Sequence, residues 1–262
     1  MLSTTPQVLA LDFDGVICDG LIEYFQTTQK AYLKLWPQDS ISPDYLATSF
    51  YKLRPVIETG WEMPVLLRAL VLGESESEIL DDWPEVLGKI VQSEKLDKRV
   101  LGETLDGVRD EWIESDLTSW LGLHKFYRGV IERLKSILLS DTKIYIISTK
   151  EGRFIQTLLA EQGINISDRY LIGKESKRPK YETIQDILIQ ESIGANQLWF
   201  VEDRLKALEL VQQRSELAGV GLFLADWGYN TQQTRDSLQN TSAIHLLSLT
   251  QFTQDFPQWY LP

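Results

Sequence analysis

The stretch from Gln7 to Gly20, QVLALDFDGVICDG, constrains this chain more than any other. Four apolar residues, Val8 to Leu11, run without alternation straight into Asp12-Phe13-Asp14-Gly15. An unbroken apolar run this short predicts a strand that is covered on both faces, as in the middle of a parallel sheet. Because Asp12 and Asp14 are two residues apart, their carboxylates lie on the same side of an extended chain, at the end of the strand.

Two carboxylates crowded at one sheet edge repel each other unless a cation or a shared proton relieves them. Ligands of open α/β sheets bind outside the carboxyl ends of the strands, which is where these two acids are expected. A hard divalent cation with oxygen ligands, most simply Mg²⁺, suits such a pair. Gly15 allows a sharp turn or the close approach of a ligand. The stretch therefore predicts a metal-dependent reaction centre.

Length and composition limit the alternatives. The 262 residues, 43% hydrophobic, suffice for one large core or for a core domain with a smaller one. A net charge of −12 argues against a nucleic-acid-binding surface. The single cysteine, Cys18, excludes an internal disulfide, and we expect it to be a small buried residue rather than a nucleophile. The first residues, MLSTTPQ, show no signal-peptide pattern, and no apolar run approaches the roughly 20 residues of a membrane span. We expect a cytoplasmic protein with no membrane partner; the sequence does not indicate an oligomeric state.

After Gly20 the hydrophobic spacing becomes helical for about a hundred residues, and no strand-like run occurs between Leu21 and Leu123. Proline and glycine residues punctuate this region. The predicted helical segments are Leu21 to Trp36, Pro43 to Ile57, Trp61 to Leu72, Glu76 to Leu96 and Lys98 to Leu121.

From His124 onward, strands alternate with helices, which predicts an α/β fold: a Rossmann-like parallel sheet with helices on both faces. We expect an α/β core from residues 1–19 and 124–262, and an all-helical domain, 20–123, inserted after the first strand. The tail from Asn230 to Pro262 predicts a helix followed by irregular packing segments. The predicted strands are Lys143 to Ile147, Tyr170 to Ile172, Gln197 to Val201 and Val220 to Leu224; the predicted helices are Gly129 to Leu139, Arg153 to Gln162, Tyr181 to Gln190 and Leu205 to Leu217.

Polar residues follow the other predicted strands at the same sheet edge. Ser148 is the first polar residue after IYII, with Thr149 next to it, although either residue could equally cap a helix. The stretch GKESKRPKYETI offers Lys174, Lys177 and Lys180. The strand QLWFV runs into the acid pair Glu202-Asp203.

The string DFDGV resembles the first motif of the haloacid dehalogenase-like (HAD) phosphohydrolases, and the hydroxyl, lysine and acid pair follow in that family's order. The helical insertion resembles the α-helical cap of the phosphoglycolate phosphatase and β-phosphoglucomutase type. The resemblance implies that Asp12 is the nucleophile, which forms an aspartyl-phosphate. It implies that Asp14 is the general acid and base, and that its backbone carbonyl is a metal ligand.

By the same resemblance, Ser148, with Thr149 second, would bond a phosphoryl oxygen. Lys180, with Lys177 second, would neutralise the nucleophile and the phosphoryl group. Asp203 would complete a Mg²⁺ site made with Asp12 and Asp14, and Glu202 is a candidate for holding a metal-bound water. In one common form of the family another acid follows about four residues later, whereas this chain has Arg204-Leu205-Lys206-Ala207, which puts the ligand count in doubt.

Substrate choice is expected to depend on the helical insertion. The stretch LRPVIETGWE places Arg54, Glu58 and Trp61 around two turn residues, which suits either a small polar substrate or a helix–helix corner with a salt bridge. Arg54 is our substrate-binding candidate there. Arg68, His124 and Tyr127 are weaker candidates, and for His124 a hinge or surface position is the expectation.

Together these features predict a magnesium-dependent phosphomonoesterase that acts on a small phosphorylated metabolite, such as a phosphoglycolate-like compound or a sugar phosphate. A phosphomutase of the same family is one alternative, since a phospho-aspartate can hand its group to a sugar instead of water. A non-catalytic binding protein that keeps the scaffold is the other.

Overall fold

A computed structural model describes residues 4–39, 43–238 and 243–260 of the chain. Parts of the predicted tail, 239–242 and 261–262, and the first three residues therefore lie outside the described residues. The structure divides into two compact units. We call Met1–Asp19 with Lys125–Pro262 the α/β unit, and Gly20–His124 the helical unit.

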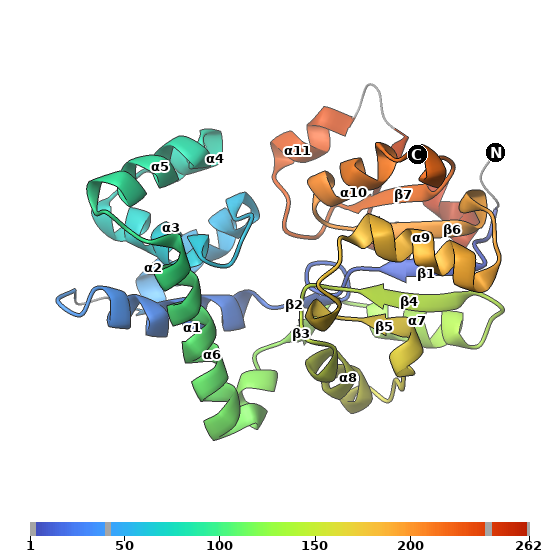
Figure 1. The fold of residues 1–262 in the computed structure, drawn as a ribbon, viewed down its shortest axis with the longest axis horizontal. Coiled ribbons are helices and arrows are strands. Elements are labelled where there is room, and N and C mark those ends of the chain that lie inside the picture. Colours follow the sequence, from blue (N-terminus) through green and yellow to red (C-terminus); the bar gives the residue numbers. More distant parts are fainter. Residues whose placement is uncertain (1–3, 40–42, 239–242, 261–262) are drawn as a thin grey trace. The chain divides into compact units, whose positions relative to one another are not determined.

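The α/β unit is built on a six-stranded sheet in which all paired neighbours are parallel (Figure 1). The predicted Rossmann-like α/β fold is confirmed. β1 lies in the middle, between β4 and β6, and all four of its residues are buried, which accounts for its unbroken apolar run. In sheet order the strands are β5 (Leu171–Ile172), β4 (Lys143–Ile147), β1 (Val8–Leu11), β6 (Leu198–Glu202), β7 (Gly221–Ala225) and β8 (Ile244–Leu247).

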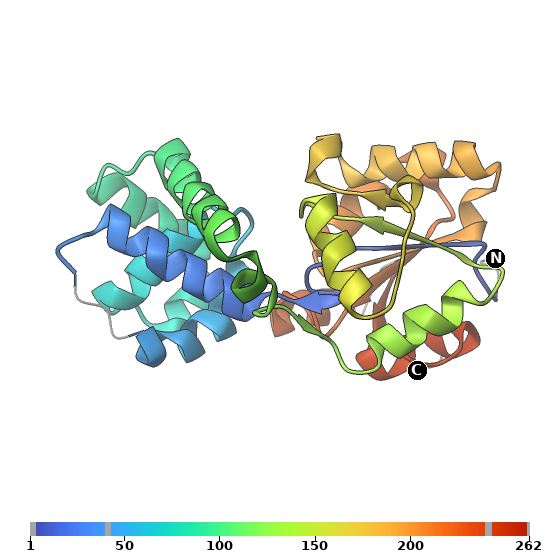
Figure 2. The same ribbon diagram turned by 90° about the horizontal axis from the view of Figure 1, so that it is seen from below.

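Both faces of this sheet are covered. On one face, Ile184 of α9 and Leu208 of α10 belong to a buried cluster with Val8 and Phe200. On the other face the ring of Trp199 packs 5.6 Å from that of Trp259. Figure 2 shows α9 and the C-terminal segment on opposite sides of the sheet. The helices of this unit are α7 (Val130–Leu138), α8 (Gly152–Glu161), α9 (Lys180–Glu191), α10 (Leu205–Gln212), α11 (Gln232–Ser237) and α12 (Leu249–Phe252), with short 3-10 segments at Asp168–Tyr170, Lys174–Ser176, Ala195–Gln197, Ser215–Leu217 and Phe256–Tyr260.

The prediction for the tail was wrong in one respect, because it missed β8. This strand pairs with β7 on one side only, so it lies at the sheet edge. Its buried residues are Ile244 and Leu247, three positions apart, with His245 and Leu246 partly exposed or exposed between them. Burial at a spacing of three resembles one face of a helix, so the alternation typical of a strand is missing from the sequence.

A second small sheet was also missed. β2 (Cys18–Asp19) and β3 (Lys125–Phe126) pair antiparallel where the chain leaves and re-enters the α/β unit (Figure 1). Each strand has two residues, and more than a hundred residues separate them along the chain. Neither length nor local pattern signals such a pair, because only the fold brings the two segments together.

The helical unit contains helices and no strand among its described residues, as predicted. Two predicted helices end differently. The helix from Pro43 stops at Leu53, since a residue directly before a proline, here Arg54, disfavours the helical conformation. The segment from Glu76 divides at Asp82, whose carboxylate caps the next helix by accepting from Glu85 N at 3.1 Å. The helices are α1 (Leu21–Leu35), α2 (Pro43–Leu53), a 3-10 turn (Arg54–Val56), α3 (Glu62–Leu72), α4 (Glu76–Asp81), α5 (Trp83–Ser93) and α6 (Lys98–Leu121), the last with a non-helical residue at Asp116. In the part of the chain that is described, no helix is both long and apolar enough to cross a bilayer.

Candidate active site

The chain folds back tightly after β1. The carbonyl oxygen of Phe13 accepts hydrogen bonds from the backbone N–H groups of Val16, Ile17 and Cys18, at 2.9–3.4 Å. Gly15 has a φ of +88°, a left-handed conformation that glycine adopts without the strain of a side chain. This turn leaves Asp12 at the carboxyl end of the central strand, where the residue is 7% exposed.

Three carboxylates converge at this edge. Asp12, Glu202 and Asp203 each place one oxygen within 4.8 Å of the other two, and all three residues are buried. Their meeting follows from the parallel pairing of β1 with β6, because Asp12 follows one strand and the acid pair ends the other. Lys180, the first residue of α9, lies against the cluster, with Nζ 2.9 Å from Asp12 Oδ1 and 2.6 Å from Glu202 Oε2.

Two glycines make room for Asp203. A Cβ on Gly15 would lie 2.2 Å from Asp203 Oδ2, and a Cβ on Gly228 would lie 2.2 Å from Asp203 Cβ. The backbone N–H of Tyr229 donates to Asp203 Oδ2 at 2.7 Å, and the side chain of Asn230 donates to Asp203 O at 3.0 Å. The loop after β7 therefore fixes the aspartate that follows β6, a role that the sequence analysis did not assign to Gly228, Tyr229 or Asn230.

The electrostatics of the cluster favour a bound cation. Burial, followed by repulsion from Glu202, raises the pKa of Asp12 to about 7 although Lys180 opposes the shift. Burial also raises the pKa of Glu202 and of Asp203. Burial lowers the pKa of Lys180, but the neighbouring carboxylates of Asp12 and Glu202 more than reverse this, so its pKa lies above its usual value. Buried carboxylates in excess of their cationic partners are costly, and an oxygen-only donor set is the kind that Mg²⁺ takes, so these residues fit the predicted metal.

The carboxylate of Asp14 lies outside this three-acid cluster. It faces Lys150, whose Nζ is 3.2 Å from Asp14 Oδ1. Of the predicted metal residues, Asp12 and Asp203 thus have their side chains together with that of Glu202. The side chain of Asp14 instead contacts the ammonium group of Lys150. Lys150 was not among our candidates; its position directly after Ser148-Thr149, at a strand end, was the available signal.

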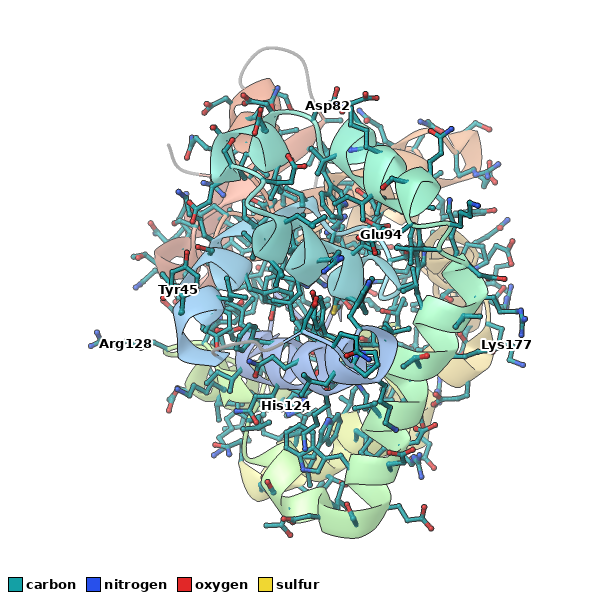
Figure 3. The ribbon with its side chains drawn as sticks, turned by 90° about the vertical axis from the view of Figure 1, so that its left-hand side faces the viewer. Tyr45, Asp82, Glu94, His124, Arg128 and Lys177 are labelled. Atoms are coloured by element: carbon teal, nitrogen blue, oxygen red, sulfur yellow. The ribbon has the colours of Figure 1, made fainter. Side chains whose placement is uncertain are left out.

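The hydroxyl and lysine candidates differ sharply in exposure. Ser148 is buried, its N–H donates to Ile172 O at 2.9 Å, and its Oγ accepts from Lys150 N at 3.1 Å, whereas Thr149 is exposed. Lys174 and Lys177 are also exposed, and Figure 3 shows Lys177 projecting outward at the margin of the molecule. Of the three candidate lysines, Lys180 is the one that contacts the acidic cluster.

The candidates in the helical unit make contacts within that unit. The guanidinium of Arg54 lies 4.8 Å from the centre of the Tyr24 ring, and its Nη1 donates to Ile57 O at 3.3 Å. The guanidinium of Arg68 pairs with Asp39 at 2.6 Å and Glu94 at 2.7 Å.

The two remaining candidates are a buried histidine and a half-buried tyrosine. His124 is 8% exposed, and its ring lies 4.6 Å from that of Trp120, so a surface position is excluded. Tyr127 belongs to the α/β unit, where burial, followed by repulsion from Asp19, raises the pKa of its hydroxyl. Cys18 is fully buried, as expected, and burial raises the pKa of its thiol.

Comparison with curated proteins finds two phosphoglycolate phosphatases. That of Pseudomonas savastanoi pv. phaseolicola is 29% identical over 145 residues, which cover 51% of this chain and 52% of the relative. That of Pseudomonas syringae pv. syringae is 25% identical over 131 residues, 48% of this chain and 47% of the relative. The chain thus spans about half the length of the curated relatives that it matches. No family model matches the chain.

Comparison with solved structures finds the same fold over nearly the whole chain. A haloacid dehalogenase-like family hydrolase from Streptococcus pneumoniae superposes with a TM-score of 0.60 at 14% identity, over 94% of both chains. A protein described as a predicted phosphoglycolate phosphatase, from Haemophilus somnus, gives 0.57 at 13% identity, over 88% of this chain and 89% of that one. A HAD family hydrolase from Deinococcus radiodurans, solved with bound phosphate and sodium, gives 0.52 at 13% identity, over 94% and 92%.

Proposed function

Since this chain has the fold of the haloacid dehalogenase-like hydrolases, as its motifs suggested, we propose that it is a magnesium-dependent phosphomonoesterase that forms an aspartyl-phosphate on Asp12. The observation that carries the proposal is the buried cluster of Asp12, Glu202 and Asp203 with Lys180 against it. Sequence similarity to phosphoglycolate phosphatases supports a small phosphorylated metabolite as substrate.

Asp12 and Asp203 are the side chains that would hold Mg²⁺, together with the backbone carbonyl of Asp14. When bound, the cation would neutralise these acids and the negative charge of the transferring phosphoryl group. Glu202 binds the protein through both of its carboxylate oxygens. Its Oε2 accepts from Lys180 Nζ at 2.6 Å, and its Oε1 accepts from the backbone N–H groups of Asp203 and Arg204. Its role would therefore be to orient Lys180 and the chain beyond β6.

The reaction has two displacements. A carboxylate oxygen of Asp12 forms a bond to phosphorus while the ester oxygen–phosphorus bond breaks, and the carboxylic acid of Asp14 gives its proton to the leaving oxygen. Water then attacks the phosphorus of the phospho-aspartate, the Asp14 carboxylate takes a proton from that water, and the bond between Asp12 and phosphorus breaks. Inorganic phosphate is released and Asp12 is regenerated.

Lys180 and Ser148 would stabilise the charge that develops on the phosphoryl oxygens. Lys180 is already adjacent to the nucleophile, at 2.9 Å from Asp12 Oδ1. The Oγ of Ser148 accepts a hydrogen bond from Lys150 N, which leaves its own proton available to donate to substrate. Thr149 at the exposed end of the same turn, and Arg54 of the helical unit, are proposed to contact the rest of the substrate.

The proposal is tested by phosphate release from a panel that begins with phosphoglycolate and sugar phosphates, with and without Mg²⁺. We expect release that needs Mg²⁺, and loss of at least about 10³-fold in the Asp12→Asn variant, because the covalent route requires a carboxylate. Isomerised sugar phosphate in place of free phosphate would identify a phosphomutase. An Asp12→Asn variant with near wild-type turnover would exclude the mechanism.

A further inference from the structure

Lys150 forms a largely buried ion pair with Asp14 at the site. Its side chain is 9% exposed and that of Asp14 is 15% exposed, with Nζ 3.2 Å from Oδ1. Burying a lysine ammonium costs solvation free energy unless a carboxylate compensates it. Holding a long side chain in one rotamer costs conformational entropy as well. A pair this enclosed is therefore held by the surrounding structure.

The backbone of Lys150 is fixed from both sides. Its N–H donates to Ser148 Oγ at 3.1 Å, and its carbonyl accepts from Lys174 N at 2.9 Å. Two residues on, Gly152 N donates to both carboxylate oxygens of Glu175 at 3.2 Å, where α8 begins. These hydrogen bonds, all made by backbone N–H groups, hold the turn after β4 and fix the point from which the Lys150 side chain extends.

Lys150 and Lys180 contact different acids of the site. Lys180 contacts Asp12 and Glu202, whereas Lys150 contacts Asp14. Asp14 is only two residues from Asp12 along the chain, yet its carboxylate is not one of the three clustered acids.

From this geometry we propose that Lys150 is a positioning residue that orients the Asp14 carboxylate to take the proton from the water that attacks the phospho-aspartate. The inference rests on the proposed function, since it concerns the second displacement of that reaction. Lys150 takes part in no bond change; the proton passes from water to the Asp14 carboxylate.

The test uses p-nitrophenyl phosphate, whose leaving group needs no protonation, so formation of the phosphoenzyme does not depend on proton donation by Asp14. In Lys150→Met we expect a rapid burst approaching one p-nitrophenolate per enzyme, followed by steady turnover at least about 10-fold slower than wild type. Acid quenching should trap the accumulated phosphoenzyme. Lys150→Arg should restore steady turnover to within a few-fold, because a guanidinium can make the same ion pair.

Two controls separate positioning from general damage. Lys206→Met makes the same substitution at an exposed lysine of α10 and should leave both phases unchanged. Asp14→Asn should reproduce the burst, and adding Lys150→Met to it should slow turnover no further, as expected for residues that act as one unit.

The outcomes distinguish this inference from the proposed function. If wild type with Mg²⁺ releases no p-nitrophenolate, both fall together. If wild type turns over but Lys150→Met has unchanged kinetics, the positioning role is excluded. A slower burst, or a raised KM with the same kcat, also excludes it and would make Lys150 a substrate contact. A thermal melt of the variant confirms that it is folded.

Discussion

At the scale of single residues, the site depends on how closely backbone and carboxylates approach one another. Asp203 lies between Gly15 and Gly228, and its Oδ2 accepts the N–H of Tyr229. A carboxylate held this way has one orientation, which is what binding a cation between fixed acids requires. The lack of a side chain at both glycines is therefore as much part of the site as the acids are.

Gly228→Ala tests this packing. The added Cβ would lie 2.2 Å from Asp203 Cβ and 2.6 Å from Gly15 O, so the loop must shift. We expect a loss of about 1–3 kcal/mol in unfolding free energy and a larger relative loss of Mg²⁺-dependent activity, measured by urea denaturation and phosphate release.

Gly88→Ala is the matched control, because a Cβ at this exposed position of α5 would meet no atom within 4 Å apart from its chain neighbours and the backbone of its own helix. It should stabilise the protein by up to about 1 kcal/mol. A Gly228→Ala variant as stable and active as wild type would contradict the tight packing around Asp203.

At the scale of elements, strands and helices of the α/β unit are tied together away from the site as well as at it. Glu191, the last residue of α9, pairs with Lys143 at the start of β4 and accepts from Tyr145 Oη at 2.6 Å and Arg169 Nη2 at 2.9 Å. Its side chain is 4% exposed. These contacts join the helix that carries Lys180 to the strand that leads to Ser148.

The Glu191 contacts predict an acid-dependent contribution to stability. The hydrogen bond from Lys143, followed by that from Tyr145, lowers the pKa of Glu191, so folding favours its ionised form. The stabilisation is fully present above the ordinary carboxyl pKa and is lost as the pH falls through the lowered pKa of Glu191.

In Glu191→Gln we expect about 1–3 kcal/mol less stability than wild type at pH 7, and a smaller difference at pH 3, both measured by urea denaturation. Glu182→Gln, on the same helix but with a side chain 39% exposed, should change stability by less than about 0.5 kcal/mol at either pH. If the loss of stability in Glu191→Gln is as large at pH 3 as at pH 7, the ionised pairing of Glu191 is contradicted.

At the scale of the whole molecule, charge balance links the site to overall stability. The carboxylates of Asp12, Asp14, Glu202 and Asp203 face the ammonium groups of Lys150 and Lys180, which leaves a formal charge of −2 in a buried region. A divalent cation would balance it. Because a ligand of the folded state stabilises that state, metal binding should be visible without any turnover.

We therefore expect Mg²⁺ at about 100 times its dissociation constant to stabilise wild type by about 2.7 kcal/mol, seen as a rise in the melting temperature that a chelator reverses. Asp203→Asn should lose most of this response, while its metal-free form melts no lower than metal-free wild type, since one buried negative charge is gone. If Mg²⁺ raises the melting temperature of both proteins equally, Asp203 is not a ligand of the metal.

Most of the fold could be read from local pattern. The predicted bounds of β1 and β4 match the structure at both ends, because the buried residues of each strand form one short apolar run, preceded in β4 by the exposed Lys143. The edge strand β8 and the pair β2–β3 could not be read, since one has a helix-like burial spacing and the other exists only through a long-range pairing. Ser148, Lys180 and Asp203 could be chosen as candidates from the sequence because each directly follows a strand or begins a helix at the same sheet edge.

What the sequence determined by itself is most of the chemical groups, with Lys150 the exception, and the end of the sheet where they gather, because the carboxyl ends of parallel strands lie at one edge. What only the tertiary structure decided is which acid meets which cation. Asp12 and Asp14 are two residues apart, yet Lys180 contacts the first and Lys150 the second. Pairing of this kind depends on how the turns after β1, β4 and β7 close in space, and those closures depend on contacts between segments far apart along the chain.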